Sequence, residues 1–264
     1  MSKLQIQYSK ELAKELGKIA VYLPGEKVNV GDIIAFPFGK SFLGKPRPLG
    51  TFKKITSLQK LNVKYTEPLF SNQPDTYQFS SKNAVDFNFS IGANADLGND
   101  DLPKGNAKMK ISFTSEGAIY FLAVDCDKKQ LDDLSALENE INAKGKKMLW
   151  KDTFLVTSVT VAKKAFIAQS RSKTSELLID GNIQGLKSNT AKIDAETKLK
   201  INKQEGDIFI KDWSNNVTVF IDLVRFEEEV FSENYRGDKA ISNEKFEESR
   251  ISFKPVLIED LLTD

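Results

Sequence analysis

Apolar and polar residues alternate with a period of two along two stretches of this chain. The apolar members of these stretches are Val85, Phe87, Phe89, Ile91, Met109, Ile111 and Phe113. Side chains two residues apart lie on the same face of a β-strand. Both stretches therefore predict strands with one apolar and one polar face. Together with the apolar run that follows them, they predict a long hairpin over residues 82–124.

A second long hairpin is predicted over residues 153–202. Its first arm is rich in β-branched and aromatic residues and contains Val159 and Val161. Its returning arm carries Leu199 and Ile201 between lysine and asparagine residues. The intervening polar segment reads as a connection.

Two segments carry apolar residues at the three- and four-residue steps of an amphipathic helix. In the first we expect Ser9 to be the N-cap, with Lys10 and Lys14 on the polar face. In the second, which contains Leu131, Leu134, Leu137 and Ile141, we expect Asp125 or Asp127 to be the cap.

Two further apolar runs complete the predicted fold. Residues 28–38 predict a buried strand, and residues 217–226 predict a central strand. Hairpins combined with helices at the N-terminus and in the middle of the chain place the protein in the α+β class. We expect one main body with a twisted antiparallel central sheet.

The amino-acid composition excludes most kinds of catalytic site. Among 264 residues there is no histidine, the usual general base and the commonest metal ligand, and Cys126 is the single cysteine. We therefore expect no enzyme activity, no cofactor and no metal, and we interpret Cys126 as a core residue in a reducing compartment. Carboxylates at Asp125, Asp127 and 227–229 are the alternative acid–base or metal candidates.

Charge and hydropathy also narrow the choice of partner. The formal net charge of +1 gives no long-range attraction for nucleic acid, which we do not expect as a partner. No stretch has the apolar length of a signal peptide or a spanning helix. A soluble, cytoplasmic protein is the expectation.

The loop over residues 39–50 combines basic and apolar side chains at a predicted strand end. Its spacing matches most of a phosphate-binding P-loop, but Pro46 stands where that motif needs Ser or Thr, so nucleotide binding is not expected. Basic groups attract anionic headgroups, and apolar groups beside them can enter the acyl boundary. The residues of this candidate membrane-contacting tip are Lys40, Phe42, Leu43, Lys45 and Arg47. The alternative is an ordinary loop whose apolar residues fold back onto the core.

The order of the elements, and the tip sequence Ser41-Phe-Leu-Gly-Lys-Pro-Arg47, resemble the pore-forming domain of gasdermins. That order is a short helix, a strand pair joined by the tip, a long hairpin, a Leu-rich helix, a second hairpin and a closing strand. The resemblance covers residues 8–230, and the short remainder looks like the tail of the bacterial type. It implies domains 1–230, pore-forming, and 231–264, an autoinhibitory tail.

The resemblance also implies a mechanism. The inactive protein is a cytoplasmic monomer covered by its tail until a protease removes the tail. The freed domain then binds acidic lipid, with Lys10 and Lys14 beside the tip as contacts, and forms a homo-oligomer. Both hairpins unroll into a β-barrel pore in the plasma (inner) membrane and cause programmed cell death of the antiviral-defence type. The apolar residues of the two hairpins are the membrane-inserting set.

The tail supplies the last expected site. Its apolar residues Phe246, Phe253, Leu257 and Leu261 would cover the oligomerisation surface, and a cut at Arg236-Gly237 would release it. A final helix that is simply part of the core is the alternative for the tail, and a non-catalytic scaffold protein is the alternative function. Bacterial gasdermins typically carry a palmitoylated cysteine near the N-terminus. This chain has none before Cys126, so lipidation of that kind is not expected.

Overall fold

The computed structural model of the chain describes residues 2–22, 26–39, 46–91, 107–144, 152–181, 199–232 and 247–262. It confirms the α+β class with large antiparallel sheets. The helices are α1 (Ser2–Leu16), α2 (Leu134–Ala143) and α3 (Ile258–Leu262). The strands are β1 (Ile19–Ala20), β2 (Asp32–Ala35), β3 (Lys53–Ser57), β4 (Leu69–Phe70), β5 (Asp75–Ser80), β6 (Val85–Ile91), β7 (Ala107–Phe113), β8 (Ile119–Gln130), β9 (Phe154–Ser170), β10 (Ser175–Gly181), β11 (Leu199–Glu205), β12 (Ile208–Ser232) and β13 (Glu247–Pro255).

The larger sheet is built around β9 and β12. These strands pair antiparallel from Ile208↔Ser170 to Arg225↔Phe154, and β8 pairs with the other edge of β9. β5 pairs in turn with β8, so the middle of this sheet has the order β5-β8-β9-β12. β1 and β13 pair with β12, and β2 connects β3 to β9.

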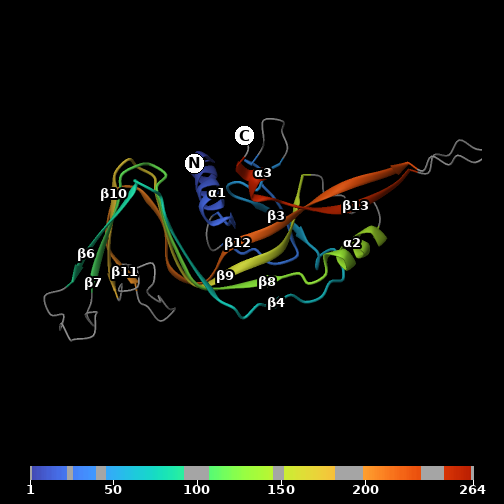
Figure 1. Ribbon diagram of the computed structural model, residues 1–264, viewed down its shortest axis with the longest axis horizontal. Helices are drawn as coiled ribbons and strands as arrows, with labels where there is room; N and C mark the ends of the chain where they lie inside the picture. The colour runs from blue at the N-terminus through green and yellow to red at the C-terminus, as the bar shows by residue number, and fades with distance from the viewer. Residues whose placement is uncertain are drawn as a thin grey trace, which may run out of the picture.

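The smaller sheet has four antiparallel strands in the order β6-β7-β10-β11. Each of them is joined to a strand of the larger sheet by a short turn. Residues 81–84 join β5 to β6, 114–118 join β7 to β8, 171–174 join β9 to β10, and 206–207 join β11 to β12. Figure 1 shows these strands curving away from the body, turning and descending as the small sheet.

The two sheets therefore repeat one strand order. The small sheet is the outer end of the large sheet folded back along one line, which we call the fold line (residues 81–84, 114–118, 171–174 and 206–207). Glycines make two of its turns possible, because Gly117 and Gly206 have φ values of 86° and 80°. A Cβ added at Gly206 would lie only 2.8 Å from the carbonyl oxygen of Thr174.

Both faces of the large sheet are covered near the fold line. Phe121 packs with Tyr8 and Leu12 of α1, whereas its neighbour Tyr120 packs with the small sheet and with Phe166. Adjacent residues of a strand point to opposite faces, so α1 and the small sheet sandwich the large sheet. This explains why β8 and β9 are apolar at every position near the fold line, over residues 119–124 and 165–168.

The first helix begins earlier than predicted, and Ser9 is not its cap. α1 starts at Ser2, and Ser9 is buried in its middle. The Ser9 hydroxyl donates to the Gln5 carbonyl oxygen (3.2 Å) and accepts from the backbone N–H of Gly50 (3.0 Å). The polar Ser9 is therefore tolerated in the core because it bonds to the backbone of Gly50, outside the helix.

The strand predicted over 28–38 is shorter, and the cap predicted for the second helix was wrong. Only Asp32–Ala35 forms a strand, because a turn closed by the Asp32 N–H to Asn29 carbonyl bond (3.1 Å) precedes it. Asp133, not Asp125 or Asp127, caps α2, and its carboxylate accepts from the Ala136 N–H at 2.8 Å. β8 continues through the predicted cap positions because it pairs with β9 up to Gln130.

The second hairpin is divided between the two sheets. β9 stays in the large sheet between β8 and β12, while β10, a strand that the sequence analysis missed, pairs with β7 and β11. The pairs β6–β7 and β10–β11 are the actual hairpins of the small sheet.

Candidate functional site

The small sheet has one strongly apolar face. Met109 and Ile111 of β7 and Leu177 and Ile179 of β10 are each 0% exposed and pack on Tyr120, Leu122 and Phe166. The strand register places these apolar residues side by side across the sheet, because Phe87 of β6 pairs with Ile111 of β7 and Ile111 pairs with Leu177 of β10. Phe87, at the edge, is 37% exposed.

The opposite face of the small sheet is polar. Lys110 on β7 forms an ion pair with Glu176 on β10 (2.7 Å), and the Asn202 amide donates to Asp180 (2.7 Å). Asp86 and Asn88 on β6 are exposed on the same side. The alternation predicted from the sequence thus separates a buried apolar face from a solvated one.

Not all predicted inserting residues lie in this sheet. Val85, Phe87, Met109, Ile111 and Phe113 do, and Phe89, Ile91, Leu199 and Ile201 lie on its strands by register. Val159 and Val161 lie instead in β9, between two paired neighbours of the large sheet. Leu177 and Ile179, which were not predicted from the sequence, complete the apolar face. Their signal in the sequence is the short apolar run Leu177-Leu-Ile179 between Glu176 and Asp180.

Tyr120 occupies the contact between the two sheets. Its ring lies edge-on to Phe87 (5.4 Å between centroids) and near Phe166 (6.0 Å). Its hydroxyl is buried and has no hydrogen-bond partner among the residues that the structure describes. Burial raises the pKa of the phenol well above its usual value. Such a group weakens the contact, because it has lost its hydration without gaining a bond.

Helix α1 touches the fold line from the other side. The Ser81 hydroxyl donates to the Glu11 carboxylate (2.6 Å) and accepts from the Ile119 N–H (3.0 Å). Lys82 forms an ion pair with Glu15 at 3.4 Å. The helix that carries the predicted lipid-contacting Lys14 therefore also holds one turn of the fold line.

The predicted tip is described only at its base. Lys40, Phe42, Leu43 and Lys45 lie outside the described residues. Arg47 is half-buried, and its N–H donates to the Gly39 carbonyl (2.6 Å), which closes the base. Phe38, beside the tip, is 56% exposed and was not among the predicted residues. Lys10 is half-buried and Lys14 exposed on α1.

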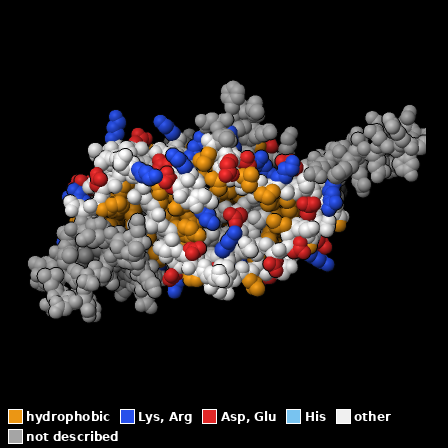
Figure 2. Space-filling model, in the orientation of Figure 1, with side chains coloured by type: hydrophobic (Ala, Val, Ile, Leu, Met, Phe, Trp, Pro, Cys, Tyr) orange, Lys and Arg blue, Asp and Glu red, His pale blue; other side chains and the backbone are white. Residues whose placement is uncertain are grey.

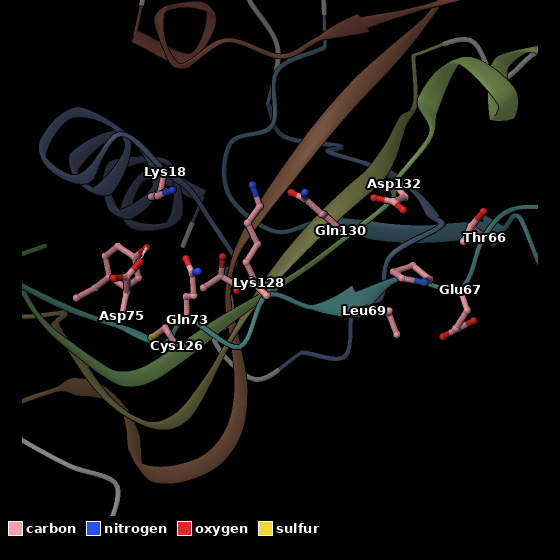
Figure 3. Close-up of a pocket in the computed structure, with 14 residues that line it drawn as sticks. Lys18, Thr66, Glu67, Leu69, Gln73, Asp75, Cys126, Lys128, Gln130 and Asp132 are labelled. Atoms are coloured by element: carbon pink, nitrogen blue, oxygen red, sulfur yellow. Dashed lines mark hydrogen bonds between the residues drawn. The ribbon is translucent and has the colours of Figure 1, made fainter.

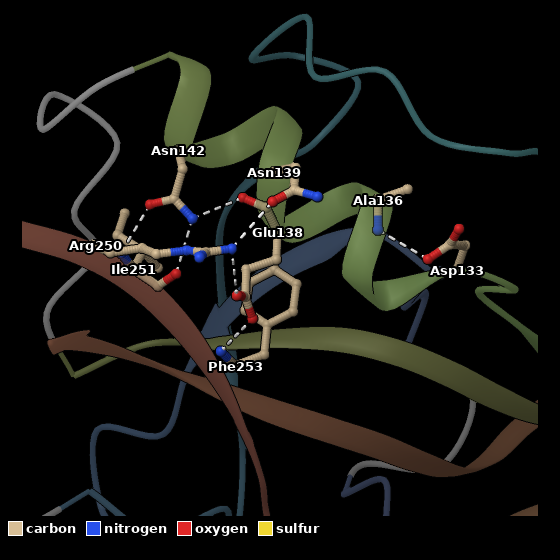
Figure 4. A network of polar contacts seen from close by, with 8 residues as sticks. All are labelled: Asp133, Ala136, Glu138, Asn139, Asn142, Arg250, Ile251 and Phe253. Carbon is tan, nitrogen blue, oxygen red and sulfur yellow. Dashed lines mark hydrogen bonds and ion pairs between the residues drawn. The ribbon is translucent and has the colours of Figure 1, made fainter.

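The described tail residues pack onto the body. β13 pairs with β12 from Pro255↔Val224 to Glu247↔Ser232, and α2 covers its outer edge. The Asn142 side chain donates to the Ile251 carbonyl (2.9 Å) and accepts from the Ile251 N–H (2.8 Å), as a neighbouring strand would (Figure 4). Glu138 accepts from the Phe253 N–H at 3.0 Å and faces Arg250.

The last helix lies between two elements predicted to contact lipid. α3 packs against α1, and Leu261 is 0% exposed in a cluster with Ala13 of α1 and Phe36 and Leu49 near the tip base. Asp260 forms an ion pair with Arg225 at 3.3 Å. Leu257 is 57% exposed, so of the predicted tail residues Leu261 is the buried anchor. Phe246, Arg236 and Gly237 lie outside the described residues.

The alternative carboxylate and thiol candidates have structural partners. Asp127 accepts from the Ser71 hydroxyl (2.5 Å) and the Asn72 N–H (3.1 Å), which fixes the turn before β5. Cys126 is buried, and burial raises the pKa of its thiol to about 12, so the reactive thiolate is disfavoured. Across the described ranges, no group of Asp, Glu and Cys side chains has a metal-binding arrangement.

A hollow of about 450 Å³ lies beside Cys126. Figure 3 shows Lys18 and Lys128 facing Asp75, Gln73 and Gln130 around it, with Thr66 and Glu67 on the far wall. Its cations and carboxylates are mixed, and Lys128 forms an ion pair with Asp222 at 2.8 Å. This arrangement does not favour one class of ligand.

The visible surface carries both signs of charge. Figure 2 shows lysine, arginine and acidic side chains interspersed, with apolar patches between them and no broad field of one sign. Of the helices in the described ranges, none has the length and apolarity needed to cross a bilayer.

Comparison with known proteins gives a likeness in structure but no match in sequence. No protein-family model matches the chain, and no curated protein matches it in sequence. The chain is similar to a solved structure described as the cryo-EM structure of the gasdermin A3 membrane pore, with a TM-score of 0.34 and 13% identity. The likeness covers 89% of this chain and 96% of that one.

Proposed function

We propose that this chain is a gasdermin-like pore-forming protein whose small sheet swings out along the fold line and enters a membrane. The observation that carries the proposal is the shared strand order of the two sheets, β5-β8-β9-β12 and β6-β7-β10-β11. Because the order is the same, straightening four short turns yields one four-stranded sheet with no change in neighbours. No backbone hydrogen bond between paired strands needs to break in this movement.

The two faces of the small sheet suit a bilayer. The face with Met109, Ile111, Leu177 and Ile179 would leave the body and meet lipid, and the face with Lys110 and Glu176 would stay in water. A sheet in a membrane needs this division, with apolar residues outside and polar residues toward a wet interior. Each small-sheet strand has seven described residues, and about 9–11 are needed to cross. The adjoining segments 92–106 and 182–198 would supply the rest. Val159 and Val161 would stay in the body.

Neighbouring copies would then join edge to edge, because an extended sheet leaves β6 and β11 with unpaired outer edges. The proposed contacts to acidic lipid are Lys10, Lys14 and the tip from Lys40 to Arg47. On binding, α1 would leave Ser81 and loosen the fold line, which links membrane contact to the opening of the small sheet.

The tail is the proposed inhibitor. α3 buries Leu261 beside α1 and the tip base, and β13 occupies the outer edge of β12. A protease cut between residues 232 and 247, with Arg236-Gly237 as the candidate bond, would separate β13 and α3 from the body. We propose cell death, of the antiviral-defence type, as the outcome in the host cell.

The proposal is tested with vesicles loaded with a quenched dye. A chain truncated after Ser232 should release dye from vesicles that contain acidic lipid, and the full chain should release little. No release by the folded, truncated chain from vesicles of any composition would refute pore formation.

A matched pair of variants ties leakage to the two-faced sheet. In the truncated chain, Phe87→Lys places a charge on the lipid side, at a cost of about 2–4 kcal/mol if it lies near the membrane centre, and should abolish release. Asn88→Lys adds the same charge on the polar side and should leave release intact. Equal effects of both substitutions would contradict the assignment of the faces. Circular dichroism of both variants checks that they fold.

A further inference from the structure

A large groove lies on the body of the molecule. It has a volume of about 1240 Å³, and its walls come from residues 27–32, from β3 and from the segment 57–70. Residues of three central strands also line it, namely Lys129 of β8, Val159 and Val161 of β9, and Asn216 and Thr218 of β12. The described residues that line it include none from the small sheet, β13 or α3, so the groove belongs to the part of the fold that stays in place.

Lysines dominate the charge of this groove. Five lysines line it, namely Lys27, Lys54, Lys60, Lys64 and Lys129, against the two carboxylates Asp32 and Glu67. Both carboxylates already have a lysine partner. Asp32 is held by Lys54 at 2.6 Å, and the exposed Glu67 lies 3.4 Å from Lys129.

Three ammonium groups remain uncompensated. Lys27, Lys60 and Lys64 are exposed, and none has a carboxylate within ion-pair distance among the residues that the structure describes. A concave surface with charges of one sign concentrates the field and attracts counter-ions of the opposite sign. The groove is therefore a positive site on a chain whose net charge is only +1.

The side chains around these lysines indicate the chemistry of a ligand. Lysine binds phosphate as a flexible point charge, and several lysines together match several phosphate groups better than one carboxylate. Asn29, Gln59 and Asn62 add neutral hydrogen-bond donors to the same lining. The volume exceeds that of a single phosphate ion, and three unpaired charges call for a polyanion.

We propose that this lysine groove, defined by Lys27, Lys60 and Lys64, binds a compact anion with several phosphate groups, either free or as the headgroup of a lipid. The groove is separate from the proposed contacts at α1 and the tip. Its occupation does not depend on pore formation, so the two proposals stand or fall separately.

The test uses the full chain and inositol hexakisphosphate as the probe. Calorimetry at low salt should give saturable binding, and the ligand should raise the melting temperature because it binds the folded state. The triple variant Lys27→Gln/Lys60→Gln/Lys64→Gln should bind at least about tenfold more weakly, because three charge-assisted contacts to the phosphate groups are lost. The control Lys53→Gln/Lys144→Gln/Lys173→Gln removes equal charge from exposed lysines outside the groove and should bind as the parent does.

Vesicles distinguish the source of the phosphate groups. If the ligand is a headgroup, vesicles with a bisphosphorylated inositol lipid should capture the full chain, and the groove variant should escape while the control is captured. If the ligand is free, the soluble probe alone should bind. Absence of binding to both probes, or equal loss in the groove variant and the control, would overturn the proposal.

Discussion

The two sheets of this protein are made from consecutive pieces of the same chain segments, but they are held in place differently. In the large sheet, β9 has a paired strand on each side and apolar neighbours above and below it, and most of its residues are buried. In the small sheet, only one face is buried, and within the described ranges its strands pair with each other alone. The central strands of the large sheet are held by hydrogen bonds on both edges and by packing on both faces. The small sheet is held against the body by its one apolar face and by the four turns of the fold line.

This difference indicates where the molecule can open. Separating the small sheet exposes its apolar face, a cost that an apolar bilayer would offset, whereas separating β9 would also break hydrogen bonds on both edges. Experiments that weaken one sheet at a time test whether the two behave as separate units.

The largest expected effect comes from cavities in each sheet. Ile111→Ala in the small sheet and Ile167→Ala in the large sheet should each cost about 2–5 kcal/mol, because both side chains are fully buried. Hydrogen exchange should separate them. Ile111→Ala should speed exchange mainly in β6, β7, β10 and β11, and Ile167→Ala throughout. Faster exchange everywhere in both variants would contradict separate units.

Alkaline pH should weaken the large sheet through Cys126. Its folded-state pKa is raised to about 12, so above the ordinary thiol pKa of about 8.5 the unfolded chain loses a proton that the folded chain keeps. The thiol's contribution is full below about pH 8.5, and stability then falls by up to about 1.4 kcal/mol per pH unit. Urea unfolding between pH 8 and 10 should show the decline, and Cys126→Ala should flatten it. An identical slope in the variant would contradict the assignment.

The tail should loosen when α2 loses its hold on β13. Asn142→Ala removes two hydrogen bonds to Ile251 and leaves its backbone groups partly unsatisfied, for an expected cost of about 1–2 kcal/mol. Limited proteolysis should then cut the tail faster. The control Ser135→Ala, at an exposed position of the same helix, should change the cutting rate little.

The latch between α1 and the fold line should have a smaller effect. Ser81→Ala removes the bonds to Glu11 and to the Ile119 N–H and should cost about 1 kcal/mol while speeding dye release by the truncated chain. Lys82→Ala breaks only an exposed ion pair and should leave both quantities nearly unchanged. Slower release by Ser81→Ala would argue against a latch.

An effect of similar size but opposite sign is expected at Tyr120. Tyr120→Phe keeps the ring between the sheets and removes the unpartnered hydroxyl, so it should stabilise the folded chain by about 1 kcal/mol. The same change should slow dye release by the truncated chain. A lower melting temperature would mean that the hydroxyl has a partner in solution.

The sequence predicted those parts of the fold that local pattern determines. Alternation located β6 and β7 and their faces, and helical spacing located α2 with Leu137 and Ile141 buried. Pairing between distant strands decided the rest. β8 runs past Asp125 and Asp127 because β9 pairs with it there, so the cap falls at Asp133.

Only part of the candidate site could be predicted, because the rest of it also depends on pairing between distant strands. β10 has only two fully buried apolar residues, Leu177 and Ile179, and is too short for a strong signal in a polar segment. The fold line could not be predicted, because it depends on the order in which eight strands pair. The lysine groove likewise depends on tertiary folding, which brings Lys27 together with Lys60 and Lys64 from a later segment.

The most direct test of the central claim is a distance measured between spin labels on the small sheet and on the body. Labels at Asn88→Cys and Ser135→Cys occupy exposed positions, and replacing Cys126 by Ala removes the native thiol. When the truncated chain acts on acidic vesicles, a strand that swings out at about 3.3 Å per residue should change this distance by about 20–30 Å. An unchanged distance while the vesicles leak would contradict the account.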